Sequence, residues 1–259
     1  MARRWSEVPA DLPVTTTRAA DAVIEVRDLR KEYRGPRPML VRRLDVRAGE
    51  IVAIAGLDEH AAELFVSVIT GALLPDAGVV RVFGRDTRGI STLEQWLVWL
   101  EQFGIVSRRA ALLDTLTVAQ NIAVPLTLDL FPLPDKTIAA VRALATDAGV
   151  APEILDRAPG EIPSEMHARV RLARALALGP SLLLLEHPWA ALARAAASAF
   201  AADVATLSRA RGLTILALAN DHQLNRTLAD RLLTLEPATG DLRQTRLALR
   251  WFSGRHVSS

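Results

Sequence analysis

The sequence predicts an α/β fold: a mostly parallel sheet with helices on both faces, antiparallel strands near the N-terminus, and a separate helical subdomain. Three observations predict it. Continuous apolar runs such as IVAIAG and SLLLLE are typical of strands buried on both faces of a sheet. These runs alternate with helical patterns, which favours parallel pairing. Between residues 109 and 165, prolines separate short helical patterns, which indicates the helical subdomain.

The elements of the first half follow in a simple order. From Val23 the stretch VIEVRDL alternates apolar and polar residues, as a half-buried strand does. The segment LVRRLDVRAGE turns at Gly49 into the buried run IVAIAG. Residues 59–70 place apolar side chains on one helical face, and Gly71 is suited to end that helix. A turn and a further strand are expected in LLPDAGVVRVFGRD.

The second half continues the alternation. A helix rich in Arg, Ala and Leu is predicted from Met166 to Leu178, followed by the strand SLLLLEHP. A helix over residues 195–211 precedes the strand LTILALAN, and a short helix then leads to the strand RLLTLEP. The regular alternation of strand and helix predicts a sheet covered on both faces.

The composition excludes several classes of protein. A chain of 259 residues can form one α/β domain with a smaller subdomain. It contains no cysteine, which excludes a disulfide framework and thiolate chemistry. No apolar run resembles a signal peptide or reaches the length of a membrane span. The net charge is +2 and the basic residues are scattered, so nucleic-acid binding is not expected.

We expect the chain to divide into three parts. Residues 1–21 are rich in Pro, Thr and Arg without periodicity, and are expected to form a flexible lead-in. One domain is predicted over residues 22–240, including the helical subdomain at about 109–165. Residues 241–259 form a basic tail with two aromatic residues, which could be a partner-facing helix or a loose end.

Several stretches, taken in order, resemble the ATP-binding subunit of ABC transporters from about Val23 to Leu235. They are LRKEYRG, RAGEIVAIAG, TGALLPDAGVVRVFGRD, ALLDTLTVAQNIAVPL and ARVRLARALALGPSLLLLEHPWAAL. The resemblance implies a P-loop NTPase-like core and places Tyr33 where the family has the aromatic that stacks on adenine. A narrower likeness to the Mla- and Mce-type lipid-transport class rests on Met166 and the AALLD segment.

The resemblance places a Walker A loop directly after the run IVAIA. Such a loop, G-x-x-x-x-G-K-[ST], uses glycines to wrap backbone N–H groups around phosphates, a lysine for the β/γ oxygens, and a hydroxyl for magnesium. Its first glycine is kept as Gly56. Ala61, Ala62 and Glu63 stand where the second glycine, the lysine and the hydroxyl are expected. The only two lysines of the chain lie elsewhere in the sequence.

The same loop also carries three carboxylates, those of Asp58, Glu59 and Glu63. They would repel a triphosphate, since two unit charges 4 Å apart interact by about 1 kcal/mol in water and about 4 kcal/mol at an effective dielectric constant of about 20. A carboxylate at a helix start also caps N–H groups and opposes the helix dipole, which stabilises the helix by about 1 kcal/mol without a ligand. We therefore expect these carboxylates to replace the phosphate.

The Q-loop glutamine of the family corresponds to Arg108, with Arg109 beside it. We hypothesise that Arg108 pairs with Glu63 or Asp58 and closes the site internally. The alternative is a solvated arginine.

The remaining motifs of the family are replaced as well. The signature loop, which presents backbone N–H groups to the γ-phosphate across a dimer interface, reads Pro163-Ser164-Glu165-Met166. The Walker B strand ends in Glu186-His187 where the family has Asp-Glu. Asn220 replaces the switch histidine, and Ala193 replaces the D-loop aspartate. From this we expect no catalytic residue and no metal site.

The features that are kept serve folding, whereas the groups that would touch phosphate, metal or water are replaced. We therefore predict a non-hydrolysing structural or regulatory subunit that docks on an ABC permease through its helical subdomain, peripheral on the cytoplasmic face of the membrane, with no cofactor. The narrower likeness would make the cargo a lipid, and a second ATP-binding subunit or a second copy would be a further partner. Two alternatives stay open: a divergent ATPase that uses Glu186 and His187 with Mg²⁺ and ATP, and a nucleotide sensor that holds ATP through Tyr33.

Overall fold

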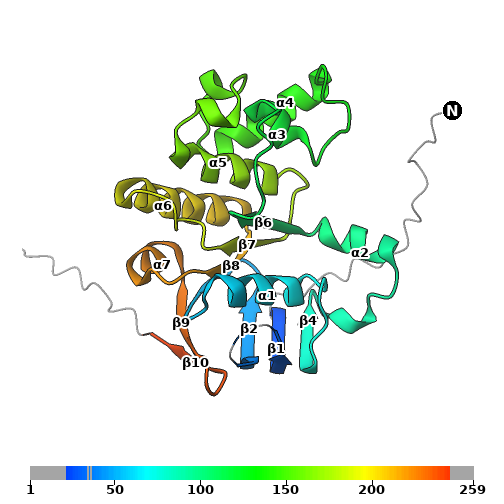
Figure 1. Cartoon of the computed structure of the whole chain (residues 1–259), viewed down its shortest axis with the longest axis vertical. Coiled ribbons are helices and arrows are strands. Elements are labelled where there is room, and N and C mark those ends of the chain that lie inside the picture. The colour runs from blue at the N-terminus through cyan, green and yellow to red at the C-terminus, as the bar shows by residue number, and fades with distance from the viewer. Residues whose placement is uncertain (1–21, 34, 36, 246–259) are drawn as a thin grey trace, which may run out of the picture.

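The computed structural model describes residues 22–33, 35 and 37–245, and divides them between two sheets and the helices around them (Figure 1). The expected α/β class, with a mostly parallel sheet and antiparallel N-terminal strands, is confirmed. The residues 1–21 of the expected lead-in and the residues 246–259 of the expected tail lie outside the described residues.

The central sheet has six strands, and five of them run parallel. Across the sheet they are β10 (Asp241–Gln244), β9 (Arg231–Glu236), β3 (Ile51–Ala55), β8 (Thr214–Leu218), β7 (Leu182–Glu186) and β6 (Phe103–Ser107). Every residue of β3, β7 and β8 is buried, because helices or the second sheet cover both faces. The uninterrupted apolar runs of the sequence are therefore the central strands.

The expected domain boundary at residue 240 is wrong. Asp241–Gln244 forms β10, which pairs antiparallel with β9 at the edge of the central sheet. The segment DLRQ is polar and only partly buried, so its hydrophobic pattern does not predict a strand. Pairing with the neighbouring strand, rather than burial, makes it extended.

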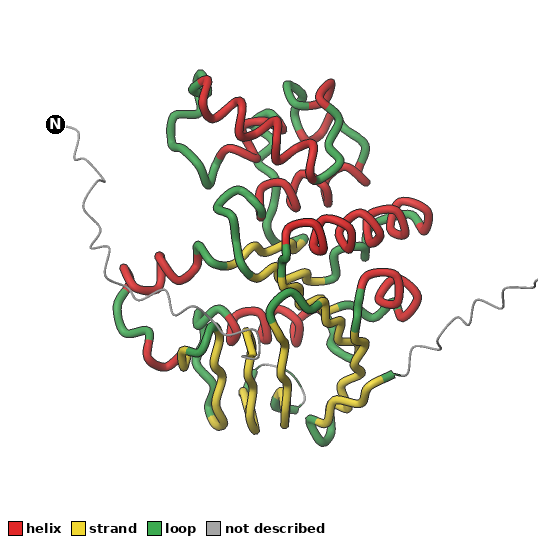
Figure 2. Tube along the Cα trace, turned by 180° about the vertical axis from the view of Figure 1, so that it is seen from behind, coloured by secondary structure: helices red, strands yellow, loops and turns green. Residues whose placement is uncertain are grey.

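The second sheet has four antiparallel strands. In order they are β2 (Met39–Arg47), β1 (Ala22–Lys31), β4 (Ala77–Val82) and β5 (Arg85–Asp86). Helix α1 (Glu59–Ile69) lies between the two sheets (Figures 1 and 2). Its Phe65 and Ile69 are completely buried there, so the helix face predicted from the sequence is the one that packs.

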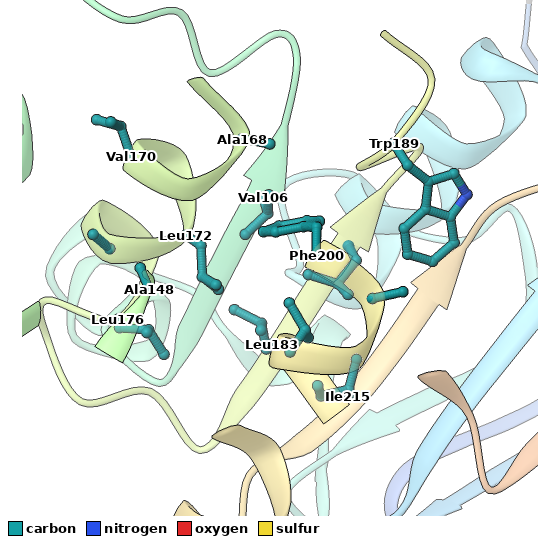
Figure 3. Close-up of a cluster of buried hydrophobic side chains, with 14 of the residues drawn as sticks. Val106, Ala148, Ala168, Val170, Leu172, Leu176, Leu183, Trp189, Phe200 and Ile215 are labelled. Carbon is teal, nitrogen blue, oxygen red and sulfur yellow. The ribbon is translucent and has the colours of Figure 1, made fainter. Parts of the chain in front are cut away.

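Alternate residues of the central strands face two different hydrophobic clusters. Leu183 and Leu185 belong to one, Leu182 and Leu184 to the other. In the first cluster, shown in Figure 3, Phe200 lies against the strand side chains. The helices that cover this side are α5 (Ser164–Ala175), α6 (Arg194–Arg211) and α7 (His222–Leu228).

Residues 109–165 hold two helices at the end of the molecule that is uppermost in Figure 1. They are α3 (Val118–Ala123) and α4 (Asp135–Asp147). The 3-10 helices among the described residues are η1 (Thr87–Gly89), η2 (Pro152–Ile154) and η3 (Pro159–Glu161). The predicted helix Met166–Leu178 begins earlier, at Ser164, because the N–H of Met166 already donates to the carbonyl of Pro163, 2.9 Å away.

Helix α2 (Leu93–Leu100) was not anticipated from the sequence. The side chain of Thr92 caps its start, and Trp99 buries itself in a cluster of aromatic rings. The centroid of the Trp99 ring lies 5.7 Å from that of Phe83 and 5.4 Å from that of Phe103. Within the described residues, none of the helices combines the length and apolar character that a membrane crossing demands.

The close packing of α5 on β6 depends on Gly104. A Cβ added there would lie 2.6 Å from the carbonyl oxygen of Ala175 and 2.8 Å from Cδ1 of Leu183. We expect Gly104→Ala to lower the free energy of unfolding by about 1–3 kcal/mol, because the helix must move away from the strand. Urea denaturation measures this. Gly89→Ala is the matched control, since nothing lies within 4 Å of its Cβ position; equal effects of the two changes would contradict the prediction.

Candidate functional site

The carboxyl ends of the parallel strands bring together most of the residues singled out from the sequence. In an α/β sheet this edge is where ligands usually bind. The loop after β3 carries Gly56, the turn after β6 carries Arg108, and β7 ends at Glu186. The strand register sets Glu186 directly opposite Ser107 on β6 and Leu218 on β8.

The first part of the site is the short loop after β3. Gly56 has φ = +94°, and a Cβ there would lie 2.5 Å from the carbonyl oxygen of Leu235, so only glycine fits. Asn220 fixes this loop from the end of β8. Its Oδ1 accepts from the Gly56 N–H at 2.8 Å, and its Nδ2 donates to the carbonyl of Leu57 at 2.9 Å. The residue at the switch-histidine position therefore ties down the loop backbone.

Helix α1 begins immediately after this loop, at Glu59. Asp58 is its N-cap: the carboxylate accepts from the Ala61 N–H at 2.8 Å, and the Asp58 carbonyl accepts from the Ala62 N–H at 2.9 Å. Both alanines are buried. The capping carboxylate expected from the sequence is thus Asp58, whereas Glu63 lies one turn further along the helix.

The centre of the site is Arg109, which bridges two carboxylates. Its Nε and Nη2 donate to the two oxygens of Glu186 at 2.9 and 2.7 Å, and its Nη1 donates to Glu63 at 2.9 Å. Such a bidentate pair is among the stronger side-chain interactions. Ser107 donates to Glu186 at 3.1 Å. The hydrogen bonds to Glu186 raise the pKa of Arg109, while its partial burial opposes this.

The hypothesis that Arg108 closes the site is wrong. Arg108 is more than half exposed, and its closest carboxylate is that of Glu59 at 3.7 Å. The chain turns tightly after β6, where the N–H groups of Ala110 and Arg109 bond to Ser107, and this turn brings Arg109 over the strand ends. An arginine that pairs with a carboxylate of the site was therefore predicted correctly, but the residue is Arg109 and not Arg108.

These side chains surround a hollow of about 370 Å³, the charged hollow, at the edge of the sheet. Its lining consists of Glu59, His60, Glu63, Arg108, Arg109, Glu186 and His187. Three carboxylates face two guanidinium groups. Within residues 22–245, apart from Arg34 and Pro36, no three His, Asp or Glu side chains form a group that could hold a metal ion.

His187 follows Glu186 in an unusual backbone conformation, with φ = +43°. Its N–H donates to the carbonyl of Leu218 at 2.9 Å, and the residue lines the charged hollow. Its Nε2 is buried and has no hydrogen-bond partner among the described residues. Ala193 precedes α6 as its N-cap and supplies no side-chain hydrogen bond.

Two other sets of residues singled out from the sequence are not part of this hollow. Pro163 is the N-cap of α5, and Ser164, Glu165 and Met166 form the first turn of that helix. Ser164 and Glu165 are exposed, whereas Met166 is partly buried against the first hydrophobic cluster. Tyr33 packs against the second hydrophobic cluster. Burial raises its pKa, and the negative charge of Asp58 adds to this effect.

The roles of Ser107 and Arg109 were not predicted from the sequence. A signal was available, because Glu186 ends a run of four leucines and a buried carboxylate needs a cation or hydrogen-bond donors nearby. The end of the adjacent strand carries both, in the segment SRR. The pairing of β6 with β7 was needed to connect them.

Comparison with known proteins gives consistent matches. The family model described as ABC transporter matches residues 42–190, more than half of the chain. The sulfate/thiosulfate import ATP-binding protein CysA 2 of Chromobacterium violaceum is 33% identical over 204 residues, 78% of this chain and 52% of that protein. The methionine import ATP-binding protein MetN of Rhizobium etli is 30% identical over 223 residues, 84% of this chain and 60% of that protein. The chain thus spans little more than half the length of these curated relatives.

Solved structures match over most of the fold. A dimeric, post-hydrolysis structure of the ATP-binding cassette MJ0796 bound to ADP and Pi aligns with a TM-score of 0.72 at 20% identity, covering 86% of this chain and 99% of that one. The cbiO1 protein of Clostridium perfringens, part of the cbiONQ complex, aligns with a TM-score of 0.73 at 20% identity, covering 86% and 87%. At this identity the likeness establishes the fold.

The contacts of Arg109 with Glu63 and Glu186, which we call the bridge, should stabilise the fold. We expect Arg109→Ala to lower the free energy of unfolding by about 1–3 kcal/mol, because Glu186 stays buried without its cation; the partial exposure of Arg109 limits the loss. Arg108→Ala is the matched control and should change it by less than about 0.5 kcal/mol. Urea denaturation of both variants measures the difference. Adding Glu186→Leu to Arg109→Ala should recover part of the loss, and an unchanged stability of Arg109→Ala would contradict the role of the bridge.

Proposed function

The chain belongs to the ABC transporter family, and we propose that within it the chain is a subunit that supports a membrane permease without hydrolysing ATP. Its role is then structural or regulatory, and its attachment to the membrane runs through the permease. The relatives named above are ATP-binding proteins of import systems, which supports a role in transport.

The observation that carries this proposal is the position of the Arg109 guanidinium between Glu63 and Glu186. Glu186 stands where the family has the Walker B aspartate, and Glu63 stands where it has the hydroxyl, the two positions that serve magnesium. A guanidinium attached to the chain now pairs with both carboxylates. A magnesium ion would have to displace it and break three charge-assisted hydrogen bonds.

The loop before α1 supports the same proposal. The N–H groups of Ala61 and Ala62 already bond to Asp58, and the side chain at the lysine position is a buried methyl group. The Asp58 carboxylate has the same sign of charge as a phosphate and lies at the helix start where a phosphate would bind. The residues of this loop therefore fit a magnesium-bound triphosphate poorly.

The divergent ATPase and the nucleotide sensor remain the outcomes that would overturn the proposal. Glu186 accepts hydrogen bonds from Arg109 and Ser107 on both of its oxygens, so neither oxygen is free to orient an attacking water. A sensor would use the Tyr33 ring to stack on adenine. Tyr33 is close enough to Asp58 for the negative charge to raise its pKa.

We expect no heat of binding when the protein is titrated with magnesium ATP to 5 mM by calorimetry (a chosen condition, about 100 times a Kd of 50 µM). A Kd of about 50 µM would stabilise the protein by about 2.7 kcal/mol at that concentration. This would raise the melting temperature by about 5–10 °C, so the absence of a shift is a second, independent readout. We also expect no release of phosphate.

Two variants separate the alternatives. Binding that Tyr33→Ala abolishes would identify a nucleotide sensor. Phosphate release that disappears in Glu186→Gln would identify a divergent ATPase. Either result would replace the scaffold as the function of this chain.

The surface of the helical subdomain supports the proposal that a permease is the partner of this chain. A hollow of about 610 Å³ with many apolar walls lies beside α3 and α4, and Phe131 and Leu133 contribute to it. Phe131 is 74% exposed, and Leu128 nearby in the same loop is 95% exposed. Exposed apolar side chains beside such a hollow are typical of a protein-binding surface. We propose that an apolar segment of the permease docks here. Lipid as cargo stays part of this proposal, supported by Met166 and AALLD alone.

We expect the double change Leu128→Ala and Phe131→Ala to reduce the recovery of an ABC permease with the tagged protein at least about tenfold, since each lost apolar anchor costs about 1 kcal/mol or more. Permease peptides are quantified by mass spectrometry from detergent-solubilised membranes. Leu97→Ala, which removes an exposed leucine from α2, is the matched control and should leave recovery unchanged. Equal recovery with both variants would contradict docking through the helical subdomain.

A further inference from the structure

Three arginines gather where α5 meets the turn after β6, and we call them the arginine cluster: Arg108, Arg171 and Arg174. Arg171 and Arg174 stand three residues apart on α5, so they share one face of the helix. Arg171 Nε and Arg174 Nη2 donate to the same acceptor, the carbonyl oxygen of Ala110, at 3.2 and 2.6 Å. Two positive charges therefore meet at one backbone oxygen.

The arginine cluster lacks a counter-charge of its own. Within the described residues, no carboxylate oxygen lies within 4.0 Å of a nitrogen of Arg171 or Arg174, and Arg108 has only Glu59, at 3.7 Å. Burial lowers the pKa of Arg171, and the positive charge of Arg108 lowers it further. Burial also lowers the pKa of Arg174, and the charge of Arg171 adds to this effect. Partly buried cations that repel one another are costly, so an anion bound beside them would stabilise the fold.

Arg171 carries the donors that such an anion can reach. Among the described residues, only its Nε has a hydrogen-bond partner. Its Nη1 and Nη2 do not belong to the buried side-chain atoms that lack a partner, so both nitrogens reach the surface of the molecule. The two terminal nitrogens of Arg174, in contrast, bond to the carbonyls of Ala110 and Ala111. Arg171 therefore presents an accessible pair of N–H donors that lie in one plane.

One free guanidinium fork matches the two oxygens of a single carboxylate. The pair of Arg109 and Glu186 shows the bidentate form of this contact in the same molecule. A phosphate brings a further oxygen and a second negative charge. The terminal nitrogens of Arg174 are held by carbonyls and Arg108 lies beside Glu59, so neither is placed to donate to that further oxygen.

We propose that Arg171 is a binding site for a carboxylate, which accepts from its Nη1 and Nη2 and is attracted by the positive charges of Arg108 and Arg174. The carboxylate belongs to a small organic acid or to an acidic side chain of a protein partner, and the recognition chemistry is the same for both. The site does not depend on the proposed function, because its contacts involve neither nucleotide nor the apolar hollow of the helical subdomain.

The test uses the whole chain labelled with ¹⁵N and follows the arginine Nε–H signals while sodium propionate is added to about 50 mM at constant ionic strength, which keeps screening unchanged. Propionate carries the same carboxylate as a glutamate side chain. The Arg171 signal, assigned by its loss in Arg171→Lys, should move as the carboxylate binds. Arg231 is an internal control, because its guanidinium is already paired with Glu50 at 2.8 Å, and its signal should stay in place. Propionamide, which has the same skeleton without the charge, should leave both signals unmoved.

Arg171→Lys keeps the charge and removes the fork, so it should weaken propionate binding about three- to tenfold, measured from the backbone signals of residues 108–111. Arg226→Gln is the matched control, because it removes an exposed positive charge from α7, and it should leave the affinity unchanged. A blocked alanine peptide with one central glutamate separates the two sources. Binding at least about fivefold tighter than that of propionate identifies a protein segment, because the peptide backbone then adds contacts, and equal binding identifies a small acid.

An Arg171 signal that stays fixed throughout the propionate titration would overturn the proposal. Equal shifts at Arg231, or equal shifts with propionamide, would also overturn it, since binding would then be unspecific. Inorganic phosphate that binds at least as tightly as propionate would show that the site is not selective for a carboxylate. The titration of the unmodified chain does not rely on a variant folding correctly.

Discussion

The bridge from Arg109 to Glu63 and Glu186 is the contact on which the site depends. Glu186 ends a fully buried strand, and a carboxylate in that position needs a counter-charge whether or not a ligand is bound. Arg109 supplies the charge from β6, the adjacent strand, and the same guanidinium reaches α1 through Glu63. One side chain therefore joins α1 to the ends of β6 and β7. In the family a metal ion and phosphate occupy this junction. In this chain the Arg109 side chain occupies it and forms hydrogen bonds to both carboxylates.

The replacements around the bridge compensate for one another. Asp58 satisfies the start of α1, where an anion would otherwise bind, and Asn220 satisfies the N–H and carbonyl of the loop in front of it. Loss of a ligand by itself would leave backbone donors and buried charges without partners, which is destabilising. Here the Gly56 and Ala61 N–H groups and the Glu186 carboxylate have partners within the chain. These contacts support the proposal of a scaffold that is stable without nucleotide.

The fold class could be predicted from the sequence, but the hydrogen bonds and ion pairs of the site could not. Buried strands such as β7 are visible as apolar runs because both faces of the sheet are covered. Strand β10 and helix α2 were missed because a hairpin pairing at the sheet edge and an aromatic cluster, rather than an apolar pattern, determine them. The bridge was assigned to Arg108 because residue order cannot tell which of two adjacent arginines a tight turn brings inward. The partnership of Ser107 with Glu186 similarly required the strand register.

Under the proposed function, a partner cassette does not restore activity by simple complementation. In this family a composite site joins the Walker motifs of one subunit to the signature of the other, so each subunit contributes to two sites. This chain would bring the bridged carboxylates to one of them. To the other it would bring Pro163, which has no N–H to donate, and the exposed carboxylate of Glu165. Both sites of such a pair would carry a defect, from two unrelated parts of the same chain. The two sets of replacements lie in separate stretches of the chain, one at the sheet edge and one at the start of α5. Two losses with one shared consequence support the proposal that the chain serves its partners through docking alone.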